Sequence, residues 1–431
     1  MPDVRPGPKP LAVKPEPTRV YRWAVLLAMS FAAYGSYYAF DCIGPLAPLL
    51  KGQLHFTDAN IGLLQAIYSL PNVIMMLISG LIIDRIGARK SVFLFGATTL
   101  VGLIVTSLTP RLFVMAAGRL IVGTGAEALA IATIAGNARW FRNKELSLSY
   151  GVKATIERFG SMSAQTSPAW AAAVYAYWQW PLFLSVGFGT CCVVGATLYW
   201  ILEARGERKY YLGDEEHAQS APPWREAFKF NRSFWLIVLM CVTFYSGIFP
   251  FLTFAQKLLI EAKGITPRTA SLFVGMLPFF SMVGTPLFGH LVDKVARRSL
   301  FMIFGALLLI PVYLMLAYAD IPLMIPMAMM GVAFALVPAV MWPCIAYVVE
   351  PSRLGFAYGL MDAVQQAGLV GFNLLIGWSN DHWAASVTNP AGYRPGMWMF
   401  SIVGVSALVF GIWLRRVETG KHGHGLETIR S

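Results

Sequence analysis

Six ionisable side chains lie deep inside apolar stretches of the first half of the sequence. They are Asp41, Arg119, Glu127, Lys153, Glu157 and Arg158. A charged side chain at the centre of a bilayer costs about 2.5–3.5 kcal/mol on insertion scales, so each one requires a partner, a water-filled cavity or a function. Acidic and basic groups placed together in this way can hold the ammonium and the carboxylate of one small zwitterion.

Glu127 and Arg158 are the pair best placed for this chemistry. Glu127 lies roughly 24 Å into its span, counted from Arg111 at 1.5 Å per residue, and Arg158 lies roughly 18 Å into the next span from the other side. In a hydrocarbon core of about 30 Å, both are near the middle and can face each other. The pair predicts one anionic and one cationic anchor for a zwitterion. The alternative is a buried ion pair that only joins the two spans.

The other charges have structural alternatives. Asp41 lies close to a Gly-Pro pair and can be a satisfied polar residue beside a helix break. Lys153 is near enough to a span end for its ammonium to reach the membrane surface. Arg119 lies in GRLIVGTGAE, whose glycines allow close helix packing, and we interpret it as a structural or gating residue. Asp41, Lys153 and Glu157 remain candidates for substrate contact.

The second half of the chain has almost no deep charge. Its spans carry polar and aromatic groups instead, namely Tyr245, Gln256, Trp342, Asp362, Gln365, Gln366 and Asn373. This asymmetry predicts that recognition by charge takes place in the first half and that the second half supplies shape and cover. Tyr245, Trp342 and Gln365 are the candidates for substrate contact there, although an aromatic residue inside a helix bundle more often belongs to the core.

The composition requires a membrane. Hydrophobic residues make up 57% of the 431 residues and charged residues 13%, against roughly 25% charged in a soluble domain. At about 20 residues per apolar span, the chain has room for about twelve spans. The five cysteines have neither metal-ligand nor CxxC spacing, and no nucleophile, base and orienting group occur at a usable spacing. We therefore expect no metal, no cofactor and no enzyme activity.

Apolar windows bounded by charges and by Gly or Pro predict two sets of six spans. The first set lies near 22–50, 60–83, 91–109, 111–138, 146–178 and 181–202. The second set lies near 233–260, 270–294, 298–318, 321–349, 354–381 and 396–414. Together they predict an all-α membrane protein with twelve transmembrane helices in two six-helix bundles, 22–202 and 233–414.

Polar stretches flank and separate these bundles. Residues 1–21 are predicted to form a disordered cytoplasmic tail, 203–232 a cytoplasmic linker and 415–431 a second cytoplasmic tail. With alternate loops assigned to the cytoplasm, most of the 34 Lys and Arg residues fall there. The basic residues that fall on the other side are Lys51, Arg111, Lys263, Arg268 and Arg394. This bias places both termini in the cytoplasm and explains the net charge of +12 without nucleic acid.

A short motif follows the second span and returns in the second half. Residues 80–90 read GLIIDRIGARK and residues 289–298 read GHLVDKVARR, with alanine at position 296 where glycine is expected. The two copies indicate an internal repeat and resemble the signature of the major facilitator superfamily, whose two parallel six-helix repeats alternate between conformations. For a single copy, a turn whose bases only set orientation is the alternative. The predicted conformational gate residues are Gly80, Asp84, Arg85, Gly87, Arg89, Asp293 and Arg297, together with Arg119.

Several further stretches resemble the branch of this superfamily typified by the lysosomal dipeptide transporters. They include YSLPNV at 68–73, GTGAEALA at 123–130, ERFGS at 157–161, WPCIAYVV at 342–349 and LGFAYGLMDAVQQAG at 354–368. The resemblance implies that Glu127 and Arg158 contact the amino and carboxyl termini of a peptide. Tyr68 and Asn72, in the first of these stretches, are further candidates for substrate contact. The tails lack an acidic dileucine sorting signal, so we favour a bacterial plasma membrane over the lysosome.

The sequence thus predicts a secondary transporter that moves a small solute by alternating access, with a dipeptide or similar zwitterion as the favoured cargo. One alternative is an organic-anion or drug carrier, in which Lys153 and Arg158 bind the cargo. Another is a non-transporting sensor or scaffold on the same fold. We expect a monomer in the lipid bilayer. Coupling to protons stays open, because Asp41, Glu127 and Glu157 can titrate but a paired carboxylate can stay charged.

Overall fold

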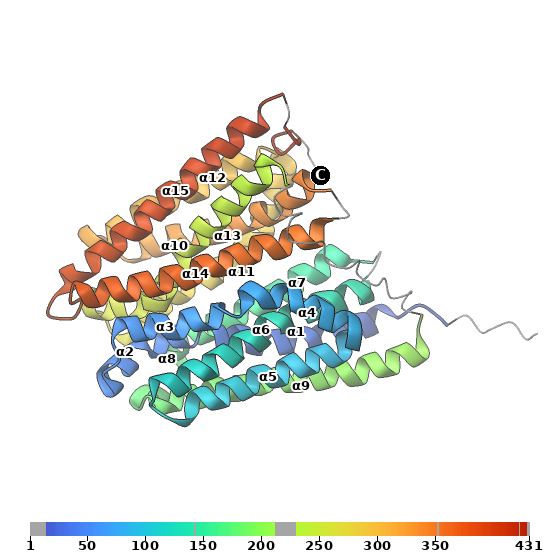
Figure 1. Ribbon diagram of the computed structural model, residues 1–431, viewed down its shortest axis with the longest axis horizontal. Helices are drawn as coiled ribbons and strands as arrows, with labels where there is room; N and C mark the ends of the chain where they lie inside the picture. The colour runs from blue at the N-terminus through green and yellow to red at the C-terminus, as the bar shows by residue number, and fades with distance from the viewer. Residues whose placement is uncertain (1–13, 142–143, 212–229, 351–352, 422, 429–431) are drawn as a thin grey trace, which may run out of the picture.

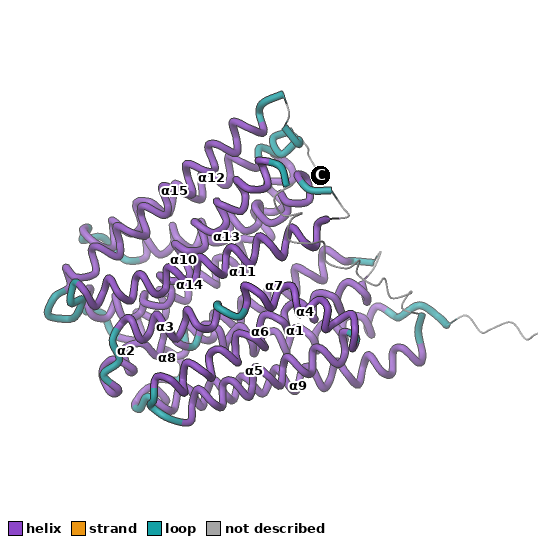
Figure 2. The backbone as a smooth tube through the Cα atoms, viewed as in Figure 1, coloured by secondary structure: helices purple, strands orange, loops and turns teal. Residues whose placement is uncertain are grey.

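The computed structural model describes residues 14–141, 144–211, 230–350, 353–421 and 423–428. These residues form helices joined by short loops, with no strand among them, as Figure 2 shows. The predictions for residues 1–13 of the first tail and for residues 212–229 of the linker lie outside the described residues. The all-α prediction is confirmed.

Helices are interrupted within three predicted spans of the first half, one of them between Gln165 of α7 and Ser167 of α8. α1 ends at Asp41 and α2 begins at Ile43, and α3 ends at Ser69 before Pro71, which cannot donate a backbone hydrogen bond. The helices of this half are α1 (Arg19–Asp41), α2 (Ile43–Leu54), α3 (Asp58–Ser69), α4 (Asn72–Ile86), α5 (Ala88–Leu108), α6 (Leu112–Phe141), α7 (Leu146–Gln165), the short α8 (Ser167–Trp170), the 3-10 helix η1 (Ala172–Ala176) and α9 (Gln179–Lys209).

The second half is built from longer uninterrupted helices. They are α10 (Arg232–Lys263), α11 (Pro267–Val295), α12 (Arg298–Tyr318), α13 (Met324–Val348), α14 (Leu354–His382), the 3-10 helix η4 (Pro390–Tyr393) and α15 (Arg394–Glu418). The ends of the bundles differ from the expected ones, since α9 continues past residue 202 to Lys209 and α15 past residue 414 to Glu418. The α9 extension has a physical reason, because Glu203 and Glu207 both accept hydrogen bonds from Arg139 of α6, at 2.7 and 3.2 Å.

Eight described helices are long and apolar enough to cross a membrane, and the number is nine when the pair Asp58–Met75 and Ile78–Ile86, bent by 61°, is counted as one span. The eight are α5, α6, α9, α10, α11, α12, α13 and the segment Pro390–Glu418 that contains α15. α1, α7 and α14 pack among them but carry more polar residues, several of which line the cavity described below. The structure therefore supports a multi-span membrane protein, and the count of twelve crossings stays a prediction.

The helices form two bundles that meet along one side. In the first half α5 packs on α6 and α9, and α1 packs on α9 and α7; in the second half α12 packs on α13 and α15, and α10 packs on α15. The halves meet through α3 with α14, α7 with α11 and α2 with α10. Figure 1 shows the two bundles close together at one end, here called the closed end, and spread apart at the other, the open end, where α1 begins and α15 ends.

Charged residues hold the halves together at the closed end. The Lys257 ammonium of α10 lies 2.6 Å from an oxygen of the Asp58 carboxylate of α3, and neither side chain has any exposure. Asp381 of α14 accepts hydrogen bonds from the backbone N–H groups of Asp58 and Ala59, at 2.8 and 2.7 Å, which satisfies the free donors at the start of α3. The closed-end cluster is completed by two residues near the Asp58–Lys257 pair, Lys51 and Glu261.

Glycine allows the backbones to approach this closely. A Cβ atom on Gly62 of α3 would lie 2.3 Å from the carbonyl oxygen of Asn373 of α14, and one on Gly377 of α14 would lie 2.5 Å from the carbonyl oxygen of Asp58. Such distances leave no room for any side chain, so the two helices are in backbone contact at the closed end. The Asp58–Lys257 pair beside this contact is fully buried, which strengthens the attraction between its charges.

Candidate functional site

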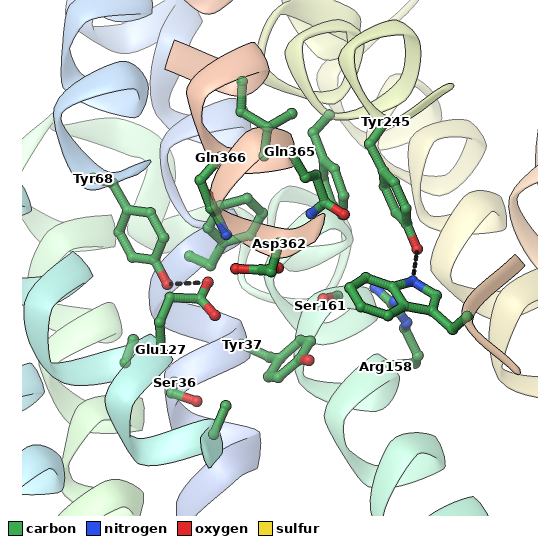
Figure 3. A pocket seen from close by; sticks show the side chains of 16 residues that line it. Ser36, Tyr37, Tyr68, Glu127, Arg158, Ser161, Tyr245, Asp362, Gln365 and Gln366 are labelled. Atoms are coloured by element: carbon green, nitrogen blue, oxygen red, sulfur yellow. Dashed lines mark hydrogen bonds between the residues drawn. The ribbon is translucent and has the colours of Figure 1, made fainter. Parts of the chain in front are cut away.

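A cavity of about 220 Å³ lies between the two bundles. It is lined from the first half by α1, α3, α6 and α7 and from the second half by α10, α13 and α14. Its lining residues are Ser36, Tyr37, Phe40, Tyr68, Ala126, Glu127, Ala130, Arg158, Ser161, Tyr245, Phe249, Trp342, Asp362, Gln365, Gln366 and Leu369. Of the residues predicted to contact substrate, the structure thus brings together Tyr68, Glu127, Arg158, Tyr245, Trp342 and Gln365, as Figure 3 shows in part.

Glu127 projects into the cavity from α6. A Cβ on Gly123 would lie only 2.0 Å from the carbonyl oxygen of Tyr68, so glycine is required for α6 to pack this closely on α3. That approach brings the Tyr68 hydroxyl to 3.4 Å from Glu127 Oε1, to which it donates a long hydrogen bond. A single weak donor leaves most of the carboxylate's capacity free for a bound cation.

Arg158 projects from α7 on the other side of the cavity. Its guanidinium lies over the ring of Phe334, with 4.9 Å from Cζ to the ring centroid, and 5.8 Å from the ring of Tyr37. In the described part of the chain no carboxylate lies within ion-pair distance of Arg158, Glu127 included. The predicted alternative, an ion pair that only joins the two spans, is therefore absent from this structure. Figure 3 shows Glu127 and Arg158 on opposite sides of the view, with Asp362 and Tyr37 between them.

Asp362 of α14 is a third charged residue of the cavity, and it is not among the residues predicted to contact substrate. Its side chain is buried, with 8% exposure, and no described group hydrogen-bonds to its Oδ2 atom. The same holds for Oε1 of Gln366, one helical turn further on. The signal was present in the sequence, because an acid occupies the first part of the predicted span 354–381. Charge at the cavity is therefore not confined to the first half.

An aromatic wall closes the second-half side of the cavity. Trp342 Nε1 donates a hydrogen bond to the Tyr245 hydroxyl at 2.9 Å, and the ring of Tyr245 stacks on that of Phe249 at 5.5 Å between centroids. Gln365 Oε1 accepts a hydrogen bond from the Cys241 thiol at 3.3 Å. These contacts fix the rings in place while leaving one face of the wall toward the cavity, which suits the apolar parts of a small solute.

Four predicted contact residues lie outside the cavity lining. Asp41 Oδ1 accepts a hydrogen bond from Gln165 Nε2 at 3.1 Å, on the closed-end side of the cavity. Lys153 and Glu157 form an ion pair with each other one turn apart on α7. Asn72 is buried, and its side-chain amide donates a hydrogen bond to the backbone carbonyl oxygen of Tyr68 in α3. Asp41, Lys153 and Glu157 each have a protein partner that a cargo would have to displace.

Arg119 hydrogen-bonds to neighbouring helices and does not line the cavity. It is fully buried and donates to the carbonyl oxygens of Ala39, Phe40 and Leu64, at 2.7, 3.2 and 3.3 Å. It also donates to Gln65 Oε1 at 2.8 Å. Two of the carbonyls belong to the last turn of α1, next to the interruption at Cys42, where helical partners are missing. Arg119 therefore joins the interrupted first span to α3 and α6.

The first copy of the repeated motif lies at the open end. Gly87 has φ +81°, a left-handed conformation that glycine adopts without strain, and it separates α4 from α5. Arg89 forms an ion pair with Glu207 of α9 at 3.2 Å. Asp84 and Arg85 are exposed, and no ion pair involving either one occurs among the described residues.

The second copy has a different turn. Ala296 and Arg297 both adopt left-handed conformations, with φ of 59° and 50°, where the first copy has one glycine. The C-terminal segment supports this turn, because the backbone N–H of Arg298 donates to Leu426 O at 3.2 Å and that of Ser299 to Glu427 Oε1 at 3.0 Å. Asp293 lies 3.6 Å from the guanidinium of Arg298. The missing glycine is thus compensated by a contact that the motif alone does not predict.

Comparisons with known proteins agree with this architecture. The family model described as Major Facilitator Superfamily matches residues 26–259 and 251–429. The chain is 30% identical to the lysosomal dipeptide transporter MFSD1 of Danio rerio over 376 residues, which cover 83% of this chain and 80% of that protein. It is 24% identical to the galacturonate transporter of Dickeya chrysanthemi over 313 residues, or 67% of this chain and 89% of that one.

A solved structure shares the fold. It is the bacterial homologue of the human lysosomal transporter Spinster, captured inward-facing and unoccupied, with a TM-score of 0.76 and 15% identity over 93% of this chain and 98% of that one. The prediction of a transporter and not an enzyme is confirmed by the family and by the names of these relatives. The chain belongs to the major facilitator superfamily, in the branch of the lysosomal dipeptide transporters, and is a secondary transporter of small solutes.

Proposed function

We propose that this protein carries dipeptides across a membrane, with Glu127 holding the peptide's ammonium group and Arg158 its carboxylate. The observation that carries the proposal is that two opposite charges, on opposite sides of one cavity, have no ionic partner among the described residues. A buried charge without a partner is unfavourable, so a ligand that supplies both missing charges gains binding energy from each. The name of the relative from Danio rerio supports this choice of cargo.

The charge balance of the cavity argues against an organic-anion carrier. The lining contains two carboxylates, Glu127 and Asp362, and one guanidinium, Arg158. An anionic cargo would meet more negative than positive charge, which disfavours its entry. A dipeptide with one basic side chain carries two positive charges and one negative charge, and so complements all three groups. We therefore propose that basic dipeptides are preferred, with the basic side chain at Asp362.

The arrangement of the two bundles supports alternating access. The closed-end cluster joins α3 to α10 and α14, while among the described residues no hydrogen bond or ion pair joins Asp84, Arg85 or Arg89 of the open-end motif to the second half. We propose that the open end faces the cytoplasm, which follows from the distribution of basic residues. A rocking motion would separate the closed-end cluster and bring the open ends of the bundles together.

The gate at the open end has an identifiable partner in this scheme. Asp84 lies near the end of α4, and α14, which contacts α4, begins at Leu354 at the same end. The free N–H groups at the start of a helix favour a nearby carboxylate. We propose that Asp84 reaches the start of α14 when the open end closes. A bacterial plasma membrane and a monomeric state stay predictions, and coupling to protons stays open.

The first prediction concerns the two anchors. Glu127→Gln and Arg158→Gln are each expected to weaken binding of a free dipeptide by roughly tenfold or more, because a charge-assisted hydrogen bond is worth about 1.5–3 kcal/mol. Acetylating the peptide's amino terminus should weaken binding to the wild type but add little in Glu127→Gln, and amidating the carboxyl terminus should behave likewise with Arg158→Gln. Calorimetric titration of the purified protein measures all of these affinities.

A matched control for this comparison of free and blocked peptides is Glu157→Gln, which changes a buried carboxylate outside the cavity lining. It should leave the ratio of blocked to free peptide affinities at the wild-type value. If blocked and free peptides instead keep the same relative affinity in Glu127→Gln and Arg158→Gln as in the wild type, the two residues do not hold the peptide termini.

The second prediction concerns Asp362. The wild type should bind lysyl-alanine more tightly than alanyl-alanine by roughly tenfold, because a second ammonium pairs with the unpartnered carboxylate. Asp362→Asn should remove this preference while retaining alanyl-alanine binding, and Asp41→Asn, a change outside the cavity lining, should keep it. Competition against a labelled dipeptide gives the affinity ratios. An unchanged preference in Asp362→Asn would assign the basic side chain to another group.

The third prediction concerns the gate. Asp84→Asn should slow dipeptide uptake into proteoliposomes several-fold while binding affinity stays within a few-fold of the wild type, because Asp84 is exposed at the open end and far along α4 from the cavity lining. Asp320→Asn, which neutralises an exposed acid in the loop after α12, is the control and should transport normally. Equal loss of binding and transport in a folded Asp84→Asn protein would place its role at the cargo site instead.

A further inference from the structure

A second cavity, of about 160 Å³, lies at the closed end of the second half and is separate from the proposed cargo site. It is formed between α10, α12 and the turn from η4 into α15. Its lining residues are Leu258, Ala262, Lys263, Leu316, Ala317, Pro390, Ala391, Tyr393, Arg394 and Met397. Two of them are basic and none is acidic, so the cavity offers positive charge next to an apolar surface.

The two basic groups of this cavity are not neutralised by the protein. Lys263 Nζ donates to the carbonyl oxygen of Ala319 at 3.3 Å, and the Arg394 guanidinium lies over the ring of Tyr318 at 5.0 Å. Neither has a carboxylate partner in the part of the chain that the structure describes. Glu261, two residues before Lys263, accepts instead from the Tyr393 hydroxyl at 2.5 Å and lies with the closed-end cluster.

Lys263 and Arg394 keep several free hydrogen-bond donors, and these suit a ligand that carries a phosphate. Lys263 retains two ammonium protons, and the guanidinium of Arg394 has five N–H groups in a planar fork that matches phosphate oxygens. Basic residues are also scarce at this end, where the sequence predicts only Lys51, Arg111, Lys263, Arg268 and Arg394. Two of the five meet at one cavity, so their convergence is not a consequence of a generally basic surface.

Neighbouring aromatic residues place the cavity at the edge of the bilayer. Trp398 Nε1 donates to the Tyr318 hydroxyl at 2.8 Å, and the two side chains are about half exposed, at 48% and 54%. Exposed Trp and Tyr residues of membrane proteins gather at the level of the lipid headgroups. The accessible apolar part of the lining, with Ala262, Ala317 and Pro390, can contact the glycerol and the first carbons of an acyl chain.

We propose that this cavity binds the headgroup of an anionic phospholipid, whose phosphate accepts hydrogen bonds from Arg394 and Lys263. A guanidinium and an ammonium beside an apolar surface suit a phosphate that is joined to acyl chains, because the planar fork of arginine matches phosphate oxygens. A lipid explains the apolar part of the lining as well as its charge, whereas free inorganic phosphate explains only the charge. A bound lipid would join α10, α12 and α15 at their closed ends, next to the residues that hold the two halves together.

The test is the thermal stability of the purified full chain in detergent, with and without added lipid. Phosphatidylglycerol should raise the unfolding temperature of the wild type, because a ligand that binds only the folded state stabilises it, and phosphatidylcholine should have little effect. The double variant Lys263→Gln, Arg394→Gln should lose the response to phosphatidylglycerol. The control Arg268→Gln, which removes an exposed basic residue at the same end but outside the cavity lining, should retain it.

Two results would overturn the proposal. One is an equal response of the double variant and the wild type to phosphatidylglycerol. The other is stabilisation of the wild type by inorganic phosphate alone to the same extent, which would identify a free-anion site. If the double variant does not fold, phosphorus analysis decides the question with Arg394→Gln alone: purified wild type should retain more phospholipid per chain than this variant, and equal retention contradicts the proposal.

Discussion

The ion pair between Asp58 and Lys257 is the interaction on which the arrangement of the two bundles depends. Both side chains are fully buried, and they belong to different halves of the chain. Removing one partner of such a pair leaves a buried charge without compensation, at a cost of about 3–5 kcal/mol. The contact therefore holds α3 and α10 in register at the closed end. The same helices carry Tyr68 and Tyr245 into the cavity, so the geometry of the cargo site follows from this pair.

Pairing separates the structural charges of this membrane protein from the ones that we assign to function. Lys257 has Asp58, Lys153 has Glu157, and Arg119 has backbone carbonyls in place of a carboxylate. Glu127, Arg158 and Asp362 line one cavity and lack ionic partners among the described residues. Because an unpaired charge in a membrane is unfavourable, these three are the positions where a ligand gains most by binding. The cavity is in this sense preorganised for a charged solute.

Much of this arrangement was predictable from the sequence. The contacts that could not be predicted share one physical reason. Apolar windows located the helices, and an acid and a base in the middle of neighbouring spans identified Glu127 and Arg158 as residues near one another in the membrane. The sequence did not reveal that Lys153 and Arg119 are satisfied by other groups. It also gave no indication of the Asp58–Lys257 pair, because Asp58 lies at the edge of a predicted span and its partner is distant along the chain. Contacts between distant segments depend on packing, which periodicity does not encode.

The position of Asp362 likewise depends on packing between segments that are distant along the chain. An acid within an apolar span was visible, but without a neighbouring base it gave no reason to prefer it over the other polar residues of the second half. Only the packing of α14 against α3 and α10 places it in the same cavity as Glu127. Likewise, α9 extends into the range expected for the linker because Arg139 of another helix neutralises its two glutamates.

The claim that the Asp58–Lys257 pair holds the two bundles together is tested most directly by measuring a distance across the closed end. Pulsed electron paramagnetic resonance reports that distance between two spin labels. The labels are attached at Gly52→Cys and Val387→Cys, two exposed positions, in a chain whose five native cysteines are replaced. The wild type should give one short distance, and Asp58→Asn a longer or broader distribution, because the fully buried Lys257 loses its nearer carboxylate and keeps only Glu261, at 3.6 Å. Asp58→Leu combined with Lys257→Met should restore the short distance, since no charge is left uncompensated. A distribution in Asp58→Asn identical to that of the wild type would contradict the account.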